Sequence, residues 1–300
     1  MQDRNAAAAL GEAAKREQME VMGENDYLIN SGDASILIEG TVTELGCTAI
    51  WKIISTEDAS VLITASGIGE NINICLITDD IALASKAHSR HMCTVLVTCS
   101  DNYRRNKEEH IADAELSSVD SVSLSFLRMT TAHASGEPFI LSQRNDFIIR
   151  ESVEEDRTEL QKICDESSEG NLINEMTSSV SRFEDVTTKA YDFYGFGMWT
   201  IVHRPSSEVI GWFGFYPENG QVWISYYLDR KFRGRGMAIR LAQVLLEYAW
   251  YEMGLTEVFA AIYEENRASV RLAEKMGFVI REDKKRPLLI MRKSLEDDYL

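Results

Sequence analysis

The residues whose types and spacing most clearly suggest chemistry form the run RKFRGRGMAIR, residues 230–240. The run has five arginine or lysine side chains and no acidic one, in a chain with a formal net charge of −17. It also has two closely spaced glycines, Gly234 and Gly236, directly before a helix-like pattern. The first N–H groups of a helix lack internal acceptors and carry partial positive charge, and glycine lets an anion approach the backbone. The run therefore predicts a binding site for a phosphate-bearing ligand.

Two familiar phosphate-binding motifs do not fit this run. A P-loop requires the string GxxxxGK[ST], which does not occur in the sequence. A dinucleotide fingerprint requires GxGxxG, but Ile239 occupies the position of the third glycine. The ligand must therefore be bound by another kind of loop.

The elements that would position the run form an α/β pattern, with strands and helices read from hydrophobic periodicity. Strands are predicted at 147–150, 197–203, 208–216, 221–228, 258–263, 278–282 and 288–293. Helices are predicted from Ser152, where Glu155 completes a capping box, from Gly236, and over 266–276. The Asn219-Gly220 pair predicts a hairpin turn, so the first part of this sheet is expected to be largely antiparallel.

Two motifs resemble those of the GCN5-related N-acetyltransferase (GNAT) family. The segment RGRGMA matches the family's (Q/R)xxGx(G/A) pyrophosphate loop through Arg233, Gly236 and Ala238. Further along, NRASVRLAEKMGF at 266–278 resembles the family's second signature, NxxSxxLxEKxGF. Two motifs in the family's order and at its spacing are far more specific than either alone.

The resemblance covers about residues 147–292 and is most like the branch that acetylates N-termini of ribosomal proteins. It implies a GNAT fold, a mixed and mostly antiparallel sheet flanked by helices, within a domain at 146–300. It also implies acetyl-CoA as the co-substrate and an amine as the acceptor, either a small molecule or a peptide N-terminus. The implied reaction is direct attack of the amine on the thioester.

The resemblance further implies which residues bind the co-substrate. Backbone amides of the loop would hold the pyrophosphate, and the preceding strand would pair with the pantetheine arm. Asn266 would touch that arm or order the loop beneath it. The implied co-substrate residues are Tyr226, Tyr227, Leu228, Arg233, Gly234, Arg235, Gly236, Met237, Ala238 and Asn266.

The catalytic residues of the family are matched less completely. Many relatives carry a glutamate base where this chain has Trp223, and a tyrosine acid where it has Ala273. In their place, Ser269 is the candidate acid for the departing thiolate. The candidates that take or relay the amine proton are Tyr263, Glu264 and Glu265. Because the two usual side chains are absent, a non-catalytic acyl-CoA-binding sensor is the alternative.

Several of these residues also have ordinary structural explanations. Asn266 and Ser269 would cap a helix in any case, and Glu265 would be a solvated strand end. A set of aromatic residues before and within the second strand would form hydrophobic core or an acceptor groove. These residues are Tyr191, Phe193, Tyr194, Phe196 and Trp199.

The first part of the chain predicts a separate small domain, residues 1–145, of a Rossmann-like α/β type without a complete nucleotide motif. Strand-like runs occur at 35–40, 60–64, 72–78 and 93–98. Helix-like segments occur at 6–22 and 80–92, and polar stretches that predict loops occur at 117–123 and 130–136. Strands that alternate with helices favour a parallel layer.

Composition sets the remaining expectations. The hydrophobic fraction of 45% and charged fraction of 26% are typical of a globular protein, and no apolar run is long enough to span a membrane. Five cysteines without a CxxC pair predict reduced thiols and a cytoplasmic location. The acidic net charge argues against a nucleic-acid partner. His88, His91 and Cys93 lack a second ligand cluster, so no metal site is expected.

Overall fold

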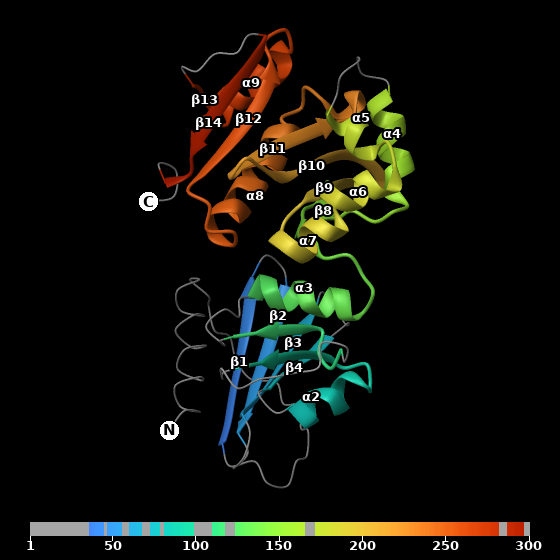
Figure 1. Cartoon of the computed structure of the whole chain (residues 1–300), viewed down its shortest axis with the longest axis vertical. Helices are drawn as coiled ribbons and strands as arrows, with labels where there is room; N and C mark the ends of the chain where they lie inside the picture. The colour runs from blue at the N-terminus through green and yellow to red at the C-terminus, as the bar shows by residue number, and fades with distance from the viewer. Residues whose placement is uncertain are drawn as a thin grey trace. The chain divides into compact units, whose positions relative to one another are not determined.

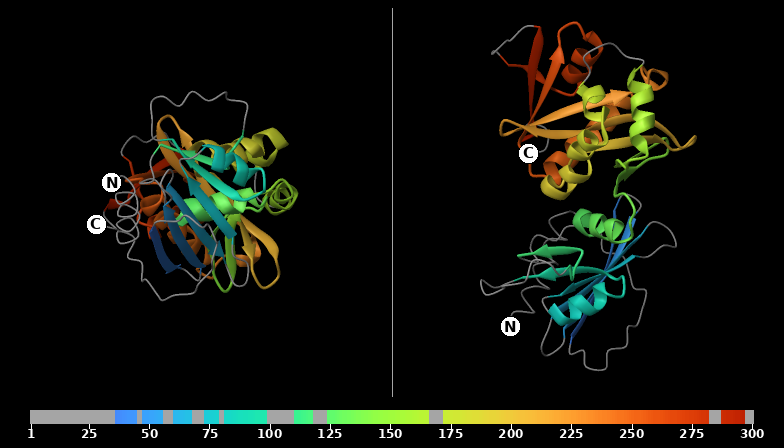
Figure 2. Two further views of the ribbon diagram at one scale, coloured as in Figure 1. Left: turned by 90° about the horizontal axis from the view of Figure 1, so that it is seen from below. Right: turned by 45° about the vertical axis from the view of Figure 1, so that its right-hand side comes forward.

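The computed structural model describes residues 36–44, 47–55, 60–67, 73–78, 81–98, 110–117, 124–165, 172–281 and 287–296. The chain divides into two compact units, Met1–Phe139 and Ile140–Leu300, and each is considered by itself (Figure 1, Figure 2). The helix predicted at 6–22 lies outside the described residues. The domain boundary predicted after residue 145 lies six residues beyond Phe139, the last residue of the first unit.

Among its described residues, the first unit forms a six-stranded sheet whose neighbouring strands follow one another in sequence. The strands β1 to β4 pair antiparallel, whereas β4, β5 and β6 pair parallel. The elements are β1 (Ile36–Glu44), β2 (Cys47–Ser55), β3 (Ser60–Gly67), β4 (Asn73–Thr78), α2 (Ile81–His88), β5 (Cys93–Val97), β6 (Ala114–Leu116) and α3 (Leu124–Ala134).

The helices α2 and α3 cover opposite faces of this sheet (Figure 1). Ala84 of α2 shares a buried cluster with Leu96, and Leu127 of α3 shares another with Val95. Because Val95 and Leu96 are successive residues of β5, their side chains point to opposite faces. A two-sided core therefore forms around β4 and β5.

The Rossmann-like expectation holds for only part of this unit. The predicted strand–helix–strand order is present as β4, α2 and β5. The preceding strands are antiparallel, because only Leu45 and Gly46 separate β1 from β2. A parallel neighbour would need a crossover of a dozen or more residues.

The loop predicted at 130–136 is wrong, since α3 continues to Ala134. Its threonines suggested a break, but their hydroxyl groups donate within the helix. Thr130 Oγ1 donates to the Phe126 carbonyl at 2.9 Å, and Thr131 Oγ1 donates to the Leu127 carbonyl at 2.8 Å. Hydroxyl groups satisfied in this way are compatible with a helix interior.

The second unit holds, within its described residues, an eight-stranded sheet in the order β13-β14-β12-β11-β10-β9-β8-β7. The neighbouring strands pair antiparallel, with the exception of the parallel pair β11 and β12. The strands are β7 (Ile140–Gln143), β8 (Phe147–Glu151), β9 (Met198–His203), β10 (Glu208–Glu218), β11 (Gln221–Leu228), β12 (Glu257–Tyr263), β13 (Val279–Ile280) and β14 (Leu288–Ser294). The mostly antiparallel sheet predicted from the sequence is confirmed.

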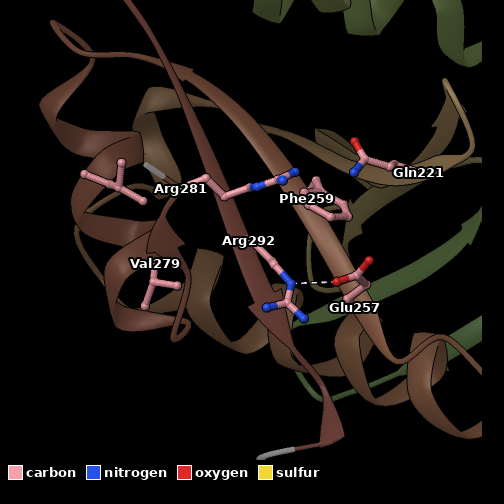
Figure 3. A pocket seen from close by; sticks show the side chains of 7 residues that line it. Gln221, Glu257, Phe259, Val279, Arg281 and Arg292 are labelled. Carbon is pink, nitrogen blue, oxygen red and sulfur yellow. Dashed lines mark hydrogen bonds and ion pairs between the residues drawn. The ribbon is translucent and has the colours of Figure 1, made fainter. Parts of the chain in front are cut away.

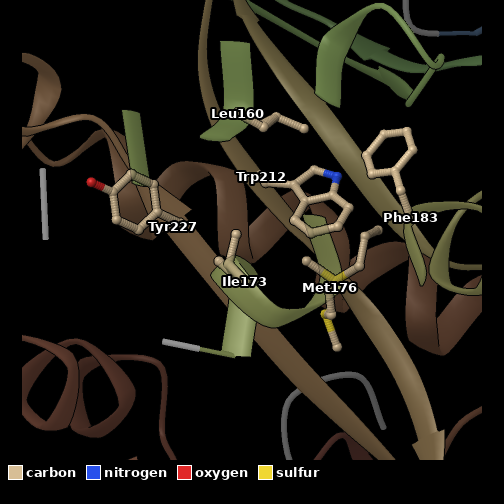
Figure 4. Close-up of a cluster of buried hydrophobic side chains, with 7 residues drawn as sticks. Leu160, Ile173, Met176, Phe183, Trp212 and Tyr227 are labelled. Carbon is tan, nitrogen blue, oxygen red and sulfur yellow. The ribbon is translucent and has the colours of Figure 1, made fainter. Parts of the chain in front are cut away.

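Helices pack on both faces of this second sheet. They are α4 (Asp156–Asp165), α5 (Leu172–Thr177), α6 (Val180–Val186), α7 (Thr188–Tyr194), α8 (Met237–Tyr251) and α9 (Arg267–Lys275). One core cluster joins Leu160 of α4, Ile173 of α5 and Phe183 of α6 to Trp212 of β10 (Figure 4). The next residue of β10, Phe213, points to the other face, where α8 and α9 lie against the sheet.

The predicted capping role of Ser152 is wrong. The helix begins at Asp156, whose carboxylate accepts a hydrogen bond from the Val153 N–H at 3.0 Å. The Ser152 hydroxyl is buried, donates to the Met198 carbonyl at 2.8 Å and accepts from Trp212 Nε1 at 2.8 Å. Ser152 thus joins three strands rather than a helix end.

Within the described residues, none of the helices has the length and apolar character needed to cross a membrane.

Candidate functional site

The parallel strands β11 and β12 separate soon after they meet. In the described part of the chain, their register contains a single pair, Trp223 with Phe259. β11 continues beyond this pair through residues 224–228, and β12 through residues 260–263. At about 3.3 Å per residue, the opening between them is roughly 13–17 Å deep. We call this opening the fork and the Trp223–Phe259 pair its vertex.

β11 directs alternate backbone groups into the fork. On its other side this strand pairs antiparallel with β10, and the Asp229 N–H donates to the Ile210 carbonyl of β10 at 2.7 Å. Hydrogen-bonded and non-hydrogen-bonded pairs alternate along antiparallel strands. Tyr227 therefore also bonds to β10, whereas the backbone groups of Tyr226 and Leu228 point into the fork. The fork thus presents peptide donors and acceptors to a ligand.

The chain leaves β11 through a tight turn. A short 3-10 turn, Arg230–Phe232, follows the strand, and the Asp229 carboxylate caps it by accepting from the Lys231 N–H at 3.0 Å. Gly234 and Gly236 then have φ angles of 77° and 75°. A Cβ at either position would meet nothing within 4 Å, so glycine is needed for the backbone conformation rather than for space.

The helix α8 opens toward this turn without a side-chain cap. Gly236 is its N-cap residue and makes no side-chain cap hydrogen bond. The Arg240 N–H is the first to donate inside the helix, to the Gly236 carbonyl at 3.3 Å. The N–H groups of Met237 and Ala238 precede it and have no acceptor in the helix. These donors and the positive end of the helix dipole are the features that the predicted anion site requires.

Arg233 supports the turn from within. Its Nε donates to the Leu228 carbonyl at 2.6 Å, and its guanidinium carbon lies 5.0 Å from the centroid of the Tyr227 ring. Its backbone N–H donates to the Arg230 carbonyl at 3.2 Å. Arg233 therefore holds the end of β11 in place, while the amides that follow it are the ones beside the anion site.

Among the other basic side chains of the run, Arg240 forms an ion pair, whereas Lys231 and Arg235 are exposed. Arg240 makes a two-pronged hydrogen bond to the Asp146 carboxylate, at 2.6 and 3.2 Å, and this bond lowers the pKa of Asp146. Lys231 and Arg235 are exposed beside the turn. They can add charge near a bound phosphate while remaining solvated.

The start of α9 is tied to β11. The Asn266 side-chain oxygen accepts from the Ser269 N–H at 3.2 Å, which makes Asn266 the N-cap of this helix. The Tyr226 hydroxyl donates to the Ser269 carbonyl at 3.1 Å, and its ring stacks on Phe213 at 5.7 Å. Burial raises the pKa of Tyr226 to about 12, so the phenol stays protonated at neutral pH.

This side-chain role of Tyr226 was not predicted from the sequence, which indicated its backbone alone. Strand alternation could have found it, because Tyr226 and Tyr227 must point to opposite faces. Tyr227 packs with the α4–α6 cluster, so Tyr226 has to face the side on which α9 lies.

The structure brings Tyr263, Glu265 and Ser269, three of the four candidate catalytic residues, to one end of β12. Tyr263 ends this strand and is 49% exposed, and its carbonyl accepts from the Asn266 N–H at 2.9 Å. Glu265 lies between Tyr263 and Asn266 in the chain and is exposed, and Ser269 is half-buried in the first turn of α9. All of them lie on the β12 side of the fork, near its open end.

The resemblance aligns Trp223 with the glutamate base of the GNAT family. Its side chain is buried, and its ring centroid lies 5.5 Å from that of Phe259. Its Nε1 donates to the Glu218 carbonyl at 3.2 Å. Trp223 therefore closes the vertex and offers no proton acceptor there.

Comparison with known families identifies the second unit. The family model for the acetyltransferase (GNAT) domain matches residues 146–279. Residues 146–279 form a GNAT domain. The match confirms the resemblance that the loop and the Asn266 motif suggested.

Curated relatives match parts of this region. "Uncharacterized N-acetyltransferase YjdG" of Bacillus subtilis (strain 168) is 27% identical over 105 residues, which cover 34% of this chain and 62% of the relative. "Uncharacterized N-acetyltransferase p20" of Bacillus licheniformis is 33% identical over 82 residues, which cover 26% of this chain and 46% of the relative. The chain thus spans between 46% and 62% of the length of these two relatives.

Solved structures similar to this chain include an acetyltransferase from Agrobacterium tumefaciens str. C58, with 18% identity and a TM-score of 0.42 over 50% of this chain and 92% of that one. They also include a ribosomal-protein-S5-alanine acetyltransferase from Vibrio fischeri, with 13% identity and a TM-score of 0.43 over 52% of this chain and 96% of that one.

The aromatic residues around α7 of the GNAT domain have two different environments. Tyr191, Phe196 and Trp199 are buried, and the Tyr191 hydroxyl donates to a backbone carbonyl of β9. Phe193 and Tyr194 are 79% and 47% exposed. The core explanation therefore holds for the first three, and for Phe193 and Tyr194 the groove explanation stays a prediction.

A pocket of about 410 Å³ adjoins the vertex of the fork (Figure 3). It lies where β11 and β12 begin and is bordered by β13 and β14. Its lining residues are Gln221, Glu257, Phe259, Val279, Ile280, Arg281 and Arg292. Phe259 belongs to both the pocket and the vertex.

Proposed function

We propose that this protein is an N-acetyltransferase that transfers the acetyl group of acetyl-CoA to an amine. The observation that carries the proposal is the continuity of two features along β11. The strand forms one arm of an open fork, and it leads directly into an uncapped helix N-terminus. A ligand with a polyamide arm and a pyrophosphate matches both features at once.

This geometry supports the proposed set of co-substrate residues. The N–H groups of residues 234–238, which include Gly234, Arg235, Gly236, Met237 and Ala238, would hold the pyrophosphate. The backbone groups of Tyr226 and Leu228 would pair with the arm in the fork. Tyr227 and Arg233 would keep this edge of the strand in place, and Asn266 would order the start of α9.

The proposed reaction is direct transfer. The amine nitrogen bonds to the thioester carbonyl carbon, the carbon–sulfur bond breaks, and the products are an amide and free coenzyme A. The proton that leaves the amine balances the one that the thiolate gains. Ser269 is the proposed donor to the thiolate, and Tyr263 or Glu265 takes or relays the amine proton. Positioning within the fork supplies much of the acceleration.

The alternative is a sensor that binds acyl-CoA without turnover, and the buried Trp223 in place of a glutamate is the observation that favours it. The two proposals share the co-substrate site and differ in product. Release of free coenzyme A thiol in the presence of an amine separates them.

The experiment combines thermal unfolding with a thiol-release assay on the full chain. Acetyl-CoA at about a hundred times its Kd should add roughly 2.7 kcal/mol to the stability of the unit that binds it. Gly236→Asp should abolish this gain, because its carboxylate would compete for the free N–H groups and repel phosphate. Stabilisation without thiol release over a panel of amines would support the sensor. A folded wild type that acetyl-CoA does not stabilise would refute both proposals.

A further inference from the structure

Hydrogen bonds from two directions hold the backbone of Ser269, the proposed acid. Its N–H donates to the Asn266 side chain at 3.2 Å, and its carbonyl accepts from the Tyr226 hydroxyl at 3.1 Å. Among the described residues, no group forms a hydrogen bond with the Ser269 hydroxyl. A hydroxyl group in this condition can rotate toward a departing thiolate, so its reach depends on where the backbone places it.

The two partners of this backbone have different effects. Asn266 lies three residues before Ser269 and caps α9, so its hydrogen bond shapes the first turn of the helix. Tyr226 belongs to β11, one arm of the fork, whereas α9 follows β12, the other arm. The hydrogen bond from Tyr226 to Ser269 therefore determines where this turn lies relative to β11.

Apolar packing does not determine that relation as closely. Val270 and Ala273 are the buried residues of α9. Hydrophobic contacts are non-directional, so they resist separation of the helix from its surroundings more than a shift along it. A hydrogen bond is directional and weakens steeply as its angle worsens. The Tyr226 hydroxyl supplies such a directional contact between β11 and the turn that carries Ser269.

The phenol of Tyr226 is itself held in place. Its ring stacks on that of Phe213, with centroids 5.7 Å apart, and Phe213 is completely buried. Close packing in a core opposes a shift of the stacked ring. Burial also raises the pKa of Tyr226 to about 12, so at neutral pH its hydroxyl keeps the proton that it donates to Ser269. The phenol is therefore a fixed donor for the Ser269 carbonyl.

The backbone of the same residue lies where the co-substrate arm would bind. An arm that leaves the anion site along β11 passes Leu228 and reaches Tyr226 roughly 7 Å further on. The peptide groups of Tyr226 would pair with this arm, while its side chain holds the turn of Ser269. One residue therefore relates the position of the arm to the position of the acid.

We propose that the Tyr226 hydroxyl is a positioning group for Ser269 and keeps the Ser269 hydroxyl within reach of the departing thiolate. This inference rests on the proposed acetyltransferase function. As the carbon–sulfur bond breaks, Ser269 Oγ gives its proton to the sulfur, and it regains the proton that the amine has released through Tyr263 or Glu265. The Tyr226 phenol keeps its own proton throughout.

The test is a double-mutant cycle in the full-length protein. The variants are Tyr226→Phe, which keeps the ring stack, Ser269→Ala, and the two combined. The matched control is Tyr248→Phe in α8, because the Tyr248 hydroxyl also donates to a backbone carbonyl, that of Gly195, at 3.4 Å and outside the fork. A thiol-release assay with the best acceptor from a panel of amines gives kcat and KM, and isothermal titration gives the Kd of acetyl-CoA.

The expected result is that Ser269→Ala lowers kcat by about a hundredfold, as the loss of a general acid does, and that Tyr226→Phe lowers it by about tenfold. The Kd of acetyl-CoA should stay within about twofold in both variants, because neither substitution changes a backbone group of β11 or the turn. In the Ser269→Ala background, Tyr226→Phe should lower kcat by less than about twofold, since the hydroxyl group that it positions is gone. Tyr248→Phe should leave kcat unchanged.

Three results would overturn the inference while acetyl transfer stands. Tyr226→Phe could leave kcat unchanged, or lower it by the same factor with and without the Ser269 hydroxyl, and either result would show that Tyr226 does not act through Ser269. Full activity of Ser269→Ala would show that Ser269 is not the acid, so that there is nothing for Tyr226 to position. A wild type that releases no thiol with any amine would instead refute the proposed function, and the inference with it.

Discussion

The two glycines of the turn allow backbone geometry to be tested separately from folding. Gly234 and Gly236 have φ angles of 77° and 75°, and Gly220 in the β10–β11 hairpin has a φ angle of 74°. A Cβ at any of the three would meet nothing within 4 Å. Each substitution to alanine should therefore cost only the left-handed backbone conformation, about 1–2 kcal/mol. For a unit of this size, that lowers its Tm by roughly 2–8 °C.

Binding of acetyl-CoA should distinguish the three variants. In Gly234→Ala and Gly236→Ala, relaxation of φ toward negative values would turn one or two N–H groups away from the phosphate. A lost hydrogen bond to a charged group is worth about 1.5–3 kcal/mol, which corresponds to a Kd weakened by roughly 10–150-fold. Gly220→Ala lies outside the site and should bind with unchanged Kd.

The assay is isothermal titration of acetyl-CoA, with differential scanning calorimetry to verify that the three variants lose similar stability. The reasoning fails if all three variants bind equally well, or if Gly220→Ala loses affinity as the other two do. Equal binding would mean that the turn does not hold the pyrophosphate. Loss in all three would mean that affinity follows general stability.

Three further predictions concern single side chains. Tyr226→Phe keeps the ring stack but removes the hydrogen bond to Ser269, so the free energy of unfolding should fall by about 1 kcal/mol; an unchanged urea midpoint would contradict this. Burial raises the pKa of Tyr226 and Tyr216 to about 12, whereas tyrosine in the unfolded chain has a pKa of about 10. The free energy of unfolding should therefore be highest below pH 10 and should fall as the pH rises through 12, which circular dichroism can follow. A hydrogen bond shared with the Cys93 thiol, 3.1 Å away, and burial raise the pKa of Cys75, so iodoacetamide should label Cys75 only after denaturation; rapid labelling of Cys75 itself in the folded protein, located by peptide mapping, would disprove its burial.

The elements of the GNAT domain could be predicted largely from the sequence because their signals are local. Asn219-Gly220 predicted a hairpin, and both residues have positive φ in the turn between β10 and β11. The glycines of the basic run predicted an open helix start, and α8 begins at that point. Each of these signals depends on backbone conformation within a few residues, which the amino-acid type restricts directly.

The roles of individual side chains in the site could not be predicted in the same way. Arg233 was expected beside the anion, but it folds back to the Leu228 carbonyl. The hydroxyl of Tyr226 bonds to Ser269, which is 43 residues away in the sequence. These contacts arise only when β11, the turn and α9 have taken their places, and no spacing in the chain encodes them. The strand pairing of the first unit could not be predicted from strand composition either, because the short connections between β1, β2 and β3 determine that these strands pair antiparallel.

The fork also explains why a ligand with amide groups suits this domain. Strands that separate leave peptide groups without ladder partners, and a buried peptide group without a partner costs about 1–3 kcal/mol. The Leu228 carbonyl is satisfied by Arg233, which stabilises the end of β11 before any ligand binds. The N–H of Leu228 and the peptide groups of Tyr226 still face the opening. An arm with alternating amide donors and acceptors would complete this edge as an added strand does, and binding would then stabilise the very region that the divergence of β11 and β12 leaves incomplete.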